Sequence, residues 1–100
     1  MTEEDLKQMV KDFPESPMGW FSLGRHYLDA KDYRQSATAL AEACKLDPDY
    51  AAAWVALGDA NAALGLPDEA RAAWNKALET PHGKRDMSLQ ADLEQRMDSL

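Results

Sequence analysis

The chain has 100 residues, of which 45% are hydrophobic and 29% charged, and its formal net charge is −7. This acidic balance disfavours nucleic acid and anionic membrane surfaces as partners, because both select proteins with a surplus of Lys and Arg. The acidic N-terminus lacks the pattern of a secretory signal, no segment approaches the roughly 18 apolar residues of a membrane span, and the single cysteine excludes an internal disulfide. We therefore expect a cytoplasmic protein.

The first element that the pattern predicts is an amphipathic helix within residues 1–15. Its apolar residues fall at helical spacing, and Thr2 is suited to cap the helix N-terminus. The stripe consists of Leu6, Met9, Val10 and Phe13. We expect this helix to cover the N-terminal end of the hydrophobic core.

Residues 17–50 predict a pair of helices. Ser16 and Pro17 are a cap residue followed by a proline at the first helical position. The first helix then carries an apolar face, and after the polar turn 29–32 a second helix carries another. The two faces are Trp20, Leu23, Gly24 and Tyr27, then Tyr33, Ala37, Leu40 and Cys44.

Residues 51–82 repeat the same pattern 34 positions later. Trp54, Leu57 and Gly58 take the places of Trp20, Leu23 and Gly24. Gly65 is suited to end the first helix of this pair and Pro67 to begin the second. A fixed period of this length indicates a repeat protein, in which each helix pair buries its apolar face on the next pair.

The glycines within the helices need a packing reason, because a helical glycine costs about 1 kcal/mol relative to alanine. We expect Gly24 and Gly58 to let the partner helix approach closely. The matching small surfaces would be Ser36 and Ala43 in one unit and Ala70 and Ala77 in the other.

After a predicted break at residues 81–83, residues 84–100 predict a last helix that caps the array. Its apolar stripe is expected to face the core, and its polar residues are expected to face water. The stripe is Leu89, Leu93, Met97 and Leu100, and the polar residues are Asp92, Glu94, Gln95 and Arg96.

The two units resemble the tetratricopeptide repeat, whose signature is Trp-x2-Leu-Gly-x2-Tyr, then Ala-x3-Phe, then Pro. The first unit departs from it with Ser36 and Leu40, and the second with Asn61 in place of the tyrosine. The resemblance implies an all-α fold of antiparallel helix hairpins stacked as a short right-handed solenoid of about six helices. It divides the chain into an N-terminal capping helix (1–15), two repeats (17–50 and 51–82) and a C-terminal capping helix (84–100).

The resemblance also implies a function, because the first helices of such repeats line a concave groove that receives a partner segment. We expect a non-catalytic adaptor that binds another protein or peptide and needs no cofactor. The positions that would face the groove are Met18, Phe21, Arg25, Leu28, Val55 and Asp59. Met18, Phe21 and Leu28 are apolar on a face that would otherwise be polar, and Met and aromatic residues are enriched in interfaces.

Alternatives stay open at these positions. Phe21 and Leu28 would be core residues if a neighbouring element covers them, and Arg25 and Asp59 would form an exposed ion pair if they lie side by side. A self-assembling module, such as a homodimer formed through the groove stripe or the last helix, is the alternative function. Met87 favours the last helix, since it lies off that helix's apolar stripe.

Other functions find less support in the sequence. In one subclass of the family, lysine, asparagine and arginine clamp a partner's C-terminal carboxylate, but here the matching positions hold Phe21, Arg25 and Ala56. His26 is expected to fill a slot between repeats and Cys44 to be a buried apolar residue. One cysteine and two scattered histidines offer no zinc spacing, and no nucleophile motif is present.

Overall fold

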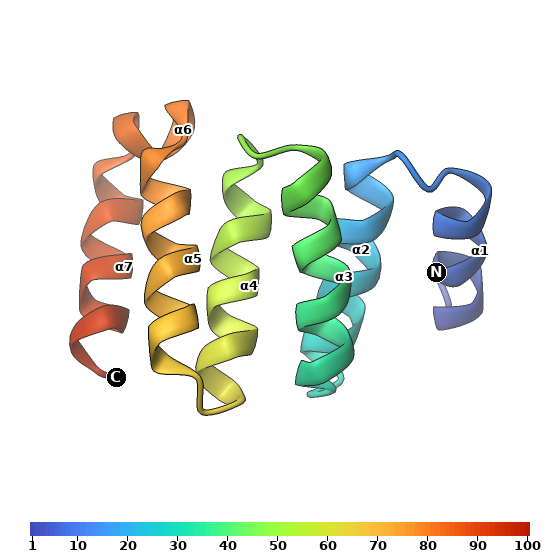
Figure 1. The fold of residues 1–100 in the computed structure, drawn as a ribbon, viewed down its shortest axis with the longest axis horizontal. Coiled ribbons are helices and arrows are strands. Elements are labelled where there is room, and N and C mark those ends of the chain that lie inside the picture. Colours follow the sequence, from blue (N-terminus) through green and yellow to red (C-terminus); the bar gives the residue numbers. More distant parts are fainter.

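The computed structural model describes residues 1–100 as seven α-helices without a β-strand (Figure 1). Each helix is joined to the next by a short turn. The helices are α1 (Glu3–Asp12), α2 (Pro17–Asp29), α3 (Tyr33–Leu46), α4 (Ala51–Ala63), α5 (Pro67–Glu79), α6 (Pro81–Arg85) and α7 (Met87–Asp98). None of them is both long enough and apolar enough to cross a membrane.

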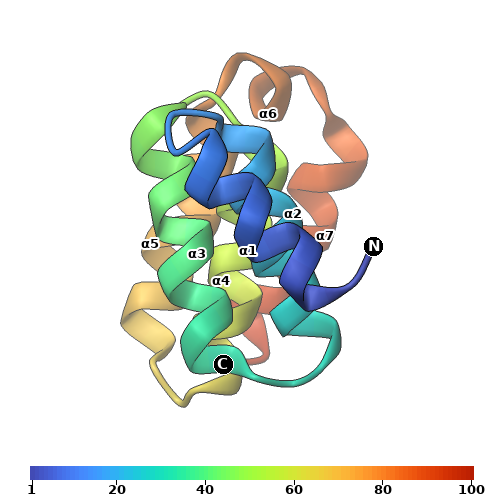
Figure 2. The same cartoon turned by 90° about the vertical axis from the view of Figure 1, so that its right-hand side faces the viewer.

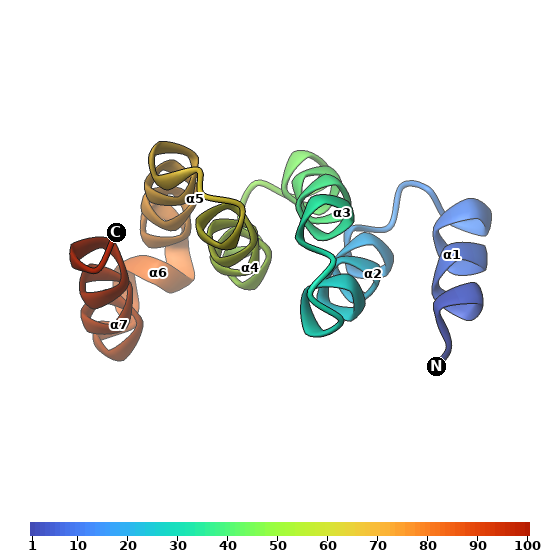
Figure 3. The same ribbon diagram turned by 90° about the horizontal axis from the view of Figure 1, so that it is seen from below.

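The helices form two layers, built from stacked antiparallel pairs. Helices α2 and α3 form one pair and α4 and α5 the next, with the strongest packing inside each pair. Seen along the helices, α3 and α5 lie on one side and α2, α4 and α7 on the other (Figure 3). Figure 2 views the stack from its N-terminal end, where α1 lies in front of the α2–α3 pair. The all-α fold of stacked hairpins is therefore confirmed.

Side-chain caps fix where several helices begin. The hydroxyl oxygen of Thr2 accepts the backbone N–H of Asp5 at 3.2 Å, and the Asp5 carboxylate accepts the backbone N–H of Thr2 at the same distance. Ser16 caps α2 through the N–H of Gly19, with Pro17 at the first helical position. These caps satisfy backbone donors that have no partner within the helix.

Two tryptophans anchor the loops that lead into the pairs. The indole N–H of Trp20 donates to the carbonyl oxygen of Pro14 at 2.8 Å, and that of Trp54 donates to Pro48, also at 2.8 Å. Both members of each bond recur after 34 residues. Each tryptophan therefore packs its ring at a helix interface and also binds the turn that precedes its own helix.

The two helical glycines are covered by large side chains of the partner helix. A Cβ on Gly24 would lie 2.5 Å from Cγ of Leu40, and a Cβ on Gly58 would overlap the indole ring of Trp74. The expected close approach is present, but small residues do not provide the main contact. Ser36 instead lies beside Gly24 and donates its hydroxyl to the Gly24 carbonyl at 2.8 Å.

The chain has seven helices where about six were expected, because α6 forms at the predicted break. Thr80 ends α5 and caps α6, accepting the N–H of Gly83 at 3.0 Å while its own hydroxyl donates to the Ala77 carbonyl at 2.6 Å. Gly83 is buried against the last turn of α5, and a Cβ there would overlap the Ala77 carbonyl. Pro81 at the first helical position starts this short helix.

The terminal helices cover the two ends of the core. Leu6 and Val10 of α1 pack with Leu23 and Tyr27 of α2, and α1 also carries Glu3 within 3.6 Å of the imidazole of His26. At the other end, Leu93 of α7 is fully buried in a cluster with residues of α5.

One expectation about charged side chains is wrong, and one alternative that the sequence left open is excluded. Arg96 of α7 does not simply face water, since its guanidinium donates to Asp59 of α4 at 2.6 Å and to Asp92 at 2.9 Å. Asp59 therefore pairs with Arg96 and not with Arg25. Arg25 lies 3.6 Å from Asp29, one turn further along α2.

Candidate functional site

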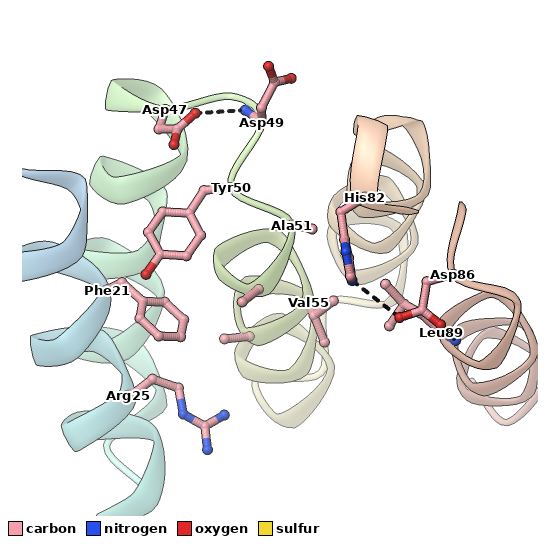
Figure 4. Close-up of a pocket in the computed structure, with 12 residues that line it drawn as sticks. Phe21, Arg25, Asp47, Asp49, Tyr50, Ala51, Val55, His82, Asp86 and Leu89 are labelled. Carbon is pink, nitrogen blue, oxygen red and sulfur yellow. Dashed lines mark hydrogen bonds and ion pairs between the residues drawn. The ribbon is translucent and has the colours of Figure 1, made fainter. Parts of the chain in front are cut away.

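An open groove of about 600 Å³ lies between α2, α4 and the junction of α6 with α7 (Figure 4). Its volume is within the roughly 300–1,000 Å³ that is usual for ligand-binding sites. It is lined by Phe21, Arg25, Asp47, Asp49, Tyr50, Ala51, Ala52, Val55, Ala56, His82, Asp86 and Leu89. We call it the central groove.

Three apolar side chains line the central groove at intervals of 34 residues. Phe21 lies on α2, Val55 on α4 and Leu89 on α7. All three are partly buried, since their inner sides contact the core clusters while the remaining surface faces the groove. The repeat thus places one apolar side chain from each of these helices at the same site.

Tyr50 extends this apolar surface from the turn before α4. Its ring lies against Phe21 with the ring centroids 4.9 Å apart and the planes inclined at 33°. Burial, together with the charge of Asp47, raises the pKa of the Tyr50 hydroxyl. The phenol therefore stays protonated at neutral pH and is available as a hydrogen-bond donor to a bound segment.

The charged residues of the central groove are mainly acidic. Asp47 and Asp49 lie in the turn between α3 and α4, and Asp86 lies at the junction of α6 with α7 (Figure 4). His82 contacts Asp86, with 3.2 Å between Nε2 and Oδ2. Arg25 is the one guanidinium at the site, and its side chain is 47% exposed.

The six residues predicted for binding lie in three different places. Phe21, Arg25 and Val55 line the central groove. Met18 is 67% exposed and lies outside it, while the partly buried Leu28 packs against the cluster around Leu40. The sixth residue, Asp59, lines a separate hollow together with its partner Arg96.

Sequence reasoning did not assign Tyr50, His82, Asp86 or Leu89 to the site. Leu89 could have been found, because it follows Val55 by the same 34 residues that separate Val55 from Phe21. The other three lie in turns or in the short helix α6, outside the periodic pattern. Tyr50 directly precedes α4, but nothing in the spacing of His82 and Asp86 indicates that the fold brings them beside this helix.

Cys44 is far from reactive in its position on α3. It is 3% exposed, among Ala43 and Ala53, and burial raises the pKa of its thiol to about 12. No group of three or more His, Cys, Asp or Glu side chains is arranged to hold a metal ion.

Comparison with known proteins identifies the fold family. Residues 21–85 match the tetratricopeptide repeat family, and this segment is more than half of the chain. The chain belongs to the tetratricopeptide repeat family. Members of this family are generally non-catalytic and typically mediate interactions between proteins.

Relatives of this tetratricopeptide repeat chain include a small bacterial protein. A TPR repeat-containing protein of Pseudomonas aeruginosa is 37% identical over 87 residues, covering 85% of this chain and 83% of that protein. The cell division cycle protein 16 homolog of Homo sapiens is 31% identical over 77 residues, or 76% of this chain. The chain spans only 12% of that human protein, so the similarity concerns a small part of it.

Two solved structures share the fold over nearly the whole chain. The first TPR of Spaghetti (RPAP3), bound to the HSP90 peptide SRMEEVD, superimposes with a TM-score of 0.84 over 97% of this chain and 75% of that chain. Its sequence identity is 18%. Protein BPP2914 of Bordetella parapertussis gives 0.79 over 99% of this chain and 86% of that chain, at 24% identity.

Proposed function

We propose that this protein is a non-catalytic adaptor that holds a short segment of a partner protein in the central groove. The observation that carries this proposal is the convergence of Phe21, Val55 and Leu89 from three helices on one open groove. Partly buried apolar side chains with fixed orientation are suitable anchors, since they lose little conformational freedom when a partner covers them.

The proposed site keeps three of the six predicted residues. Phe21, Arg25 and Val55 remain in the proposal, and Tyr50, Ala52 and Leu89 join them because they line the same groove. Met18, Leu28 and Asp59 do not line it, so we do not assign them contacts with the bound segment. We expect micromolar affinity, because a groove formed by so few helices covers only a small interface.

The sharpest test uses Ala52, which is exposed and lines the central groove on α4. The change Ala52→Trp would fill the groove without removing a core contact. Ala72→Trp is the matched control, since Ala72 is exposed on α5 and lines no hollow of the surface. Peptides selected on the wild-type protein from a displayed library of short random sequences serve as probes, and their affinity is measured by fluorescence polarisation.

We expect Ala52→Trp to weaken binding at least tenfold, with Ala72→Trp close to wild type. A second pair of variants tests the apolar anchor. Phe21→Glu should abolish binding, whereas Phe13→Glu, which changes an aromatic residue that is 66% exposed outside the groove, should not. Circular dichroism shows whether each variant keeps its helices. If no selected peptide responds to Ala52→Trp, the central groove is not the binding site.

A further inference from the structure

The carboxylates of the central groove point to the kind of segment that it accepts. We propose that the groove selects a segment in which an apolar side chain is flanked by lysine or arginine. This inference rests on the proposed function and adds the chemistry of the partner. The apolar residue would cover Phe21, Val55 and Leu89. A basic residue on one flank would lie beside Asp47 and Asp49, and one on the other flank beside Asp86.

The first argument is the position of these carboxylates around the apolar surface. Figure 4 shows Asp47 and Asp49 on one side of Ala51, at the start of α4, and Asp86 on the other side. Both groups line the same groove as the apolar anchors. A basic side chain on either flank of an anchored apolar residue would therefore meet a carboxylate on that side.

The second argument is that little positive charge within the protein offsets these carboxylates. Asp47 and Asp49 take part in no ion pair. The only ion-pair partner of Asp86 is His82. Asp47 accepts the backbone N–H of Asp49 at 3.1 Å and Asp86 accepts that of Leu89 at 2.9 Å, but these bonds bring no cation.

The third argument concerns Arg25, the one guanidinium of the groove. It already lies 3.6 Å from Asp29, so its charge is partly offset within α2. An acidic segment would meet one attracting charge and three repelling carboxylates. A basic segment would meet three attracting carboxylates and one repelling charge. The net charge of −7 on the whole chain acts in the same direction during encounter.

The test removes charge and keeps shape. Combined Asp47→Asn, Asp49→Asn and Asp86→Asn changes leave an oxygen at every acceptor position, and asparagine caps a helix about as well as aspartate does. The matched control combines Glu15→Gln, Glu94→Gln and Asp98→Asn, which are exposed acids outside the groove. Both variants lose the same formal charge.

We expect the selected peptides to be enriched in lysine or arginine beside leucine, valine or an aromatic residue. Their affinity should fall about tenfold in the groove variant, since each exposed pair contributes modestly, and stay near wild type in the control. Added sodium chloride should weaken the binding to the wild type. A selected peptide in which glutamate replaces every lysine and arginine serves as the opposite probe and should bind no more tightly than the background.

Different failures have different meanings. If the selected peptides are acidic, or if the groove variant binds them as tightly as wild type while Ala52→Trp abolishes binding, the groove is a binding site but the basic partner is wrong. Arg25→Gln then identifies an anionic partner, because it would weaken binding only in that case. If the protein forms a dimer that Ala52→Trp dissociates, a second copy occupies the groove and the inference is also wrong.

Discussion

Lys31 and Gly65 adopt the same left-handed backbone conformation at positions 34 residues apart, with φ of 64° and 77°. Each follows the last turn of the first helix in its pair. The residue after each one returns a backbone hydrogen bond of 2.9 Å to that helix, from Asp32 to Tyr27 and from Leu66 to Asn61. The repeat therefore imposes a glycine conformation on a lysine in one of its two units.

Lys31→Gly should stabilise the protein by about 0.5–1 kcal/mol. Residues other than glycine pay for a left-handed conformation, and the greater freedom of glycine in the unfolded chain offsets part of the gain. The Lys31 side chain is exposed and forms no ion pair, so little is lost with it. Urea unfolding followed by circular dichroism measures the change.

Gly65→Ala is the reciprocal variant and should destabilise the protein by about 1 kcal/mol. Nothing lies within 4 Å of a Cβ placed on Gly65, so the loss would come from the backbone alone. Equal stability of this variant and wild type would contradict the assignment of strain to this position.

Gly58→Ala should cost about 1–3 kcal/mol, although alanine is the better helix former. The added methyl group would overlap the indole of Trp74, and that ring is held by a 3.2 Å hydrogen bond from Nε1 to the Val55 carbonyl. Adding Trp74→Ala to Gly58→Ala should cost less than the sum of the two single changes, since alanine at position 74 removes the ring that the added methyl group would overlap. Additive costs in urea unfolding would show that the ring and the methyl group do not meet.

The sequence predicted the parts of the fold that follow the 34-residue period. Trp20 and Trp54, Gly24 and Gly58, and the helices that carry them are placed as the pattern indicates. Periodic apolar residues report a helix face directly, because their spacing and the helix pitch agree. The packing of Leu40 and Trp74 over the glycines was not predictable in the same way, since it depends on the separation of the helices.

The candidate site was predictable only where it follows the same period. Phe21 and Val55 were assigned from the resemblance to the repeat family, whose groove positions recur with this period. Asp86 and His82 come to the groove through α6, which the pattern of Pro81 and Gly83 did not indicate. In the sequence Gly83 indicates the end of a helix. In the structure its lack of a side chain lets α6 pack against the end of α5. The pairing of Asp59 with Arg96 was not predictable either, because ion pairs between helices depend on the distance across the helices and not on spacing along one helix.

Cys44 should react slowly with a thiol reagent such as Ellman's reagent in the folded protein and rapidly in urea. Its thiol is buried, and its pKa is raised to about 12, so almost no thiolate is present at pH 8. Fast reaction in the absence of urea would contradict the buried position.

The same shift predicts a dependence of stability on pH. Folding raises the pKa of this thiol, so the thiol does not affect stability below its ordinary pKa of 9.0. Above pH 9.0 the thiol ionises in the unfolded chain but not in the folded one, and the folded state therefore loses stability progressively toward pH 12. The free energy of unfolding should therefore fall more between pH 8 and pH 10 in the wild type than in Cys44→Ala. Parallel losses in the two proteins would show that other groups account for the dependence.

Arg96→Gln should lower the free energy of unfolding by about 1 kcal/mol and loosen α7. The guanidinium bridges Asp59 on α4 and Asp92 on α7. The side chains of Arg96 and Asp59 are only 36% and 30% exposed, so the pair between them is better shielded from water than an ordinary surface ion pair. Arg25→Gln is the control, because the pair between Arg25 and Asp29 is longer and more exposed, and it should change stability by less than about 0.5 kcal/mol. Hydrogen exchange separates the two variants: amides of α7 should exchange faster only in Arg96→Gln. Faster exchange in α2 but not in α7 would contradict the role of Arg96 in holding the last helix against α4.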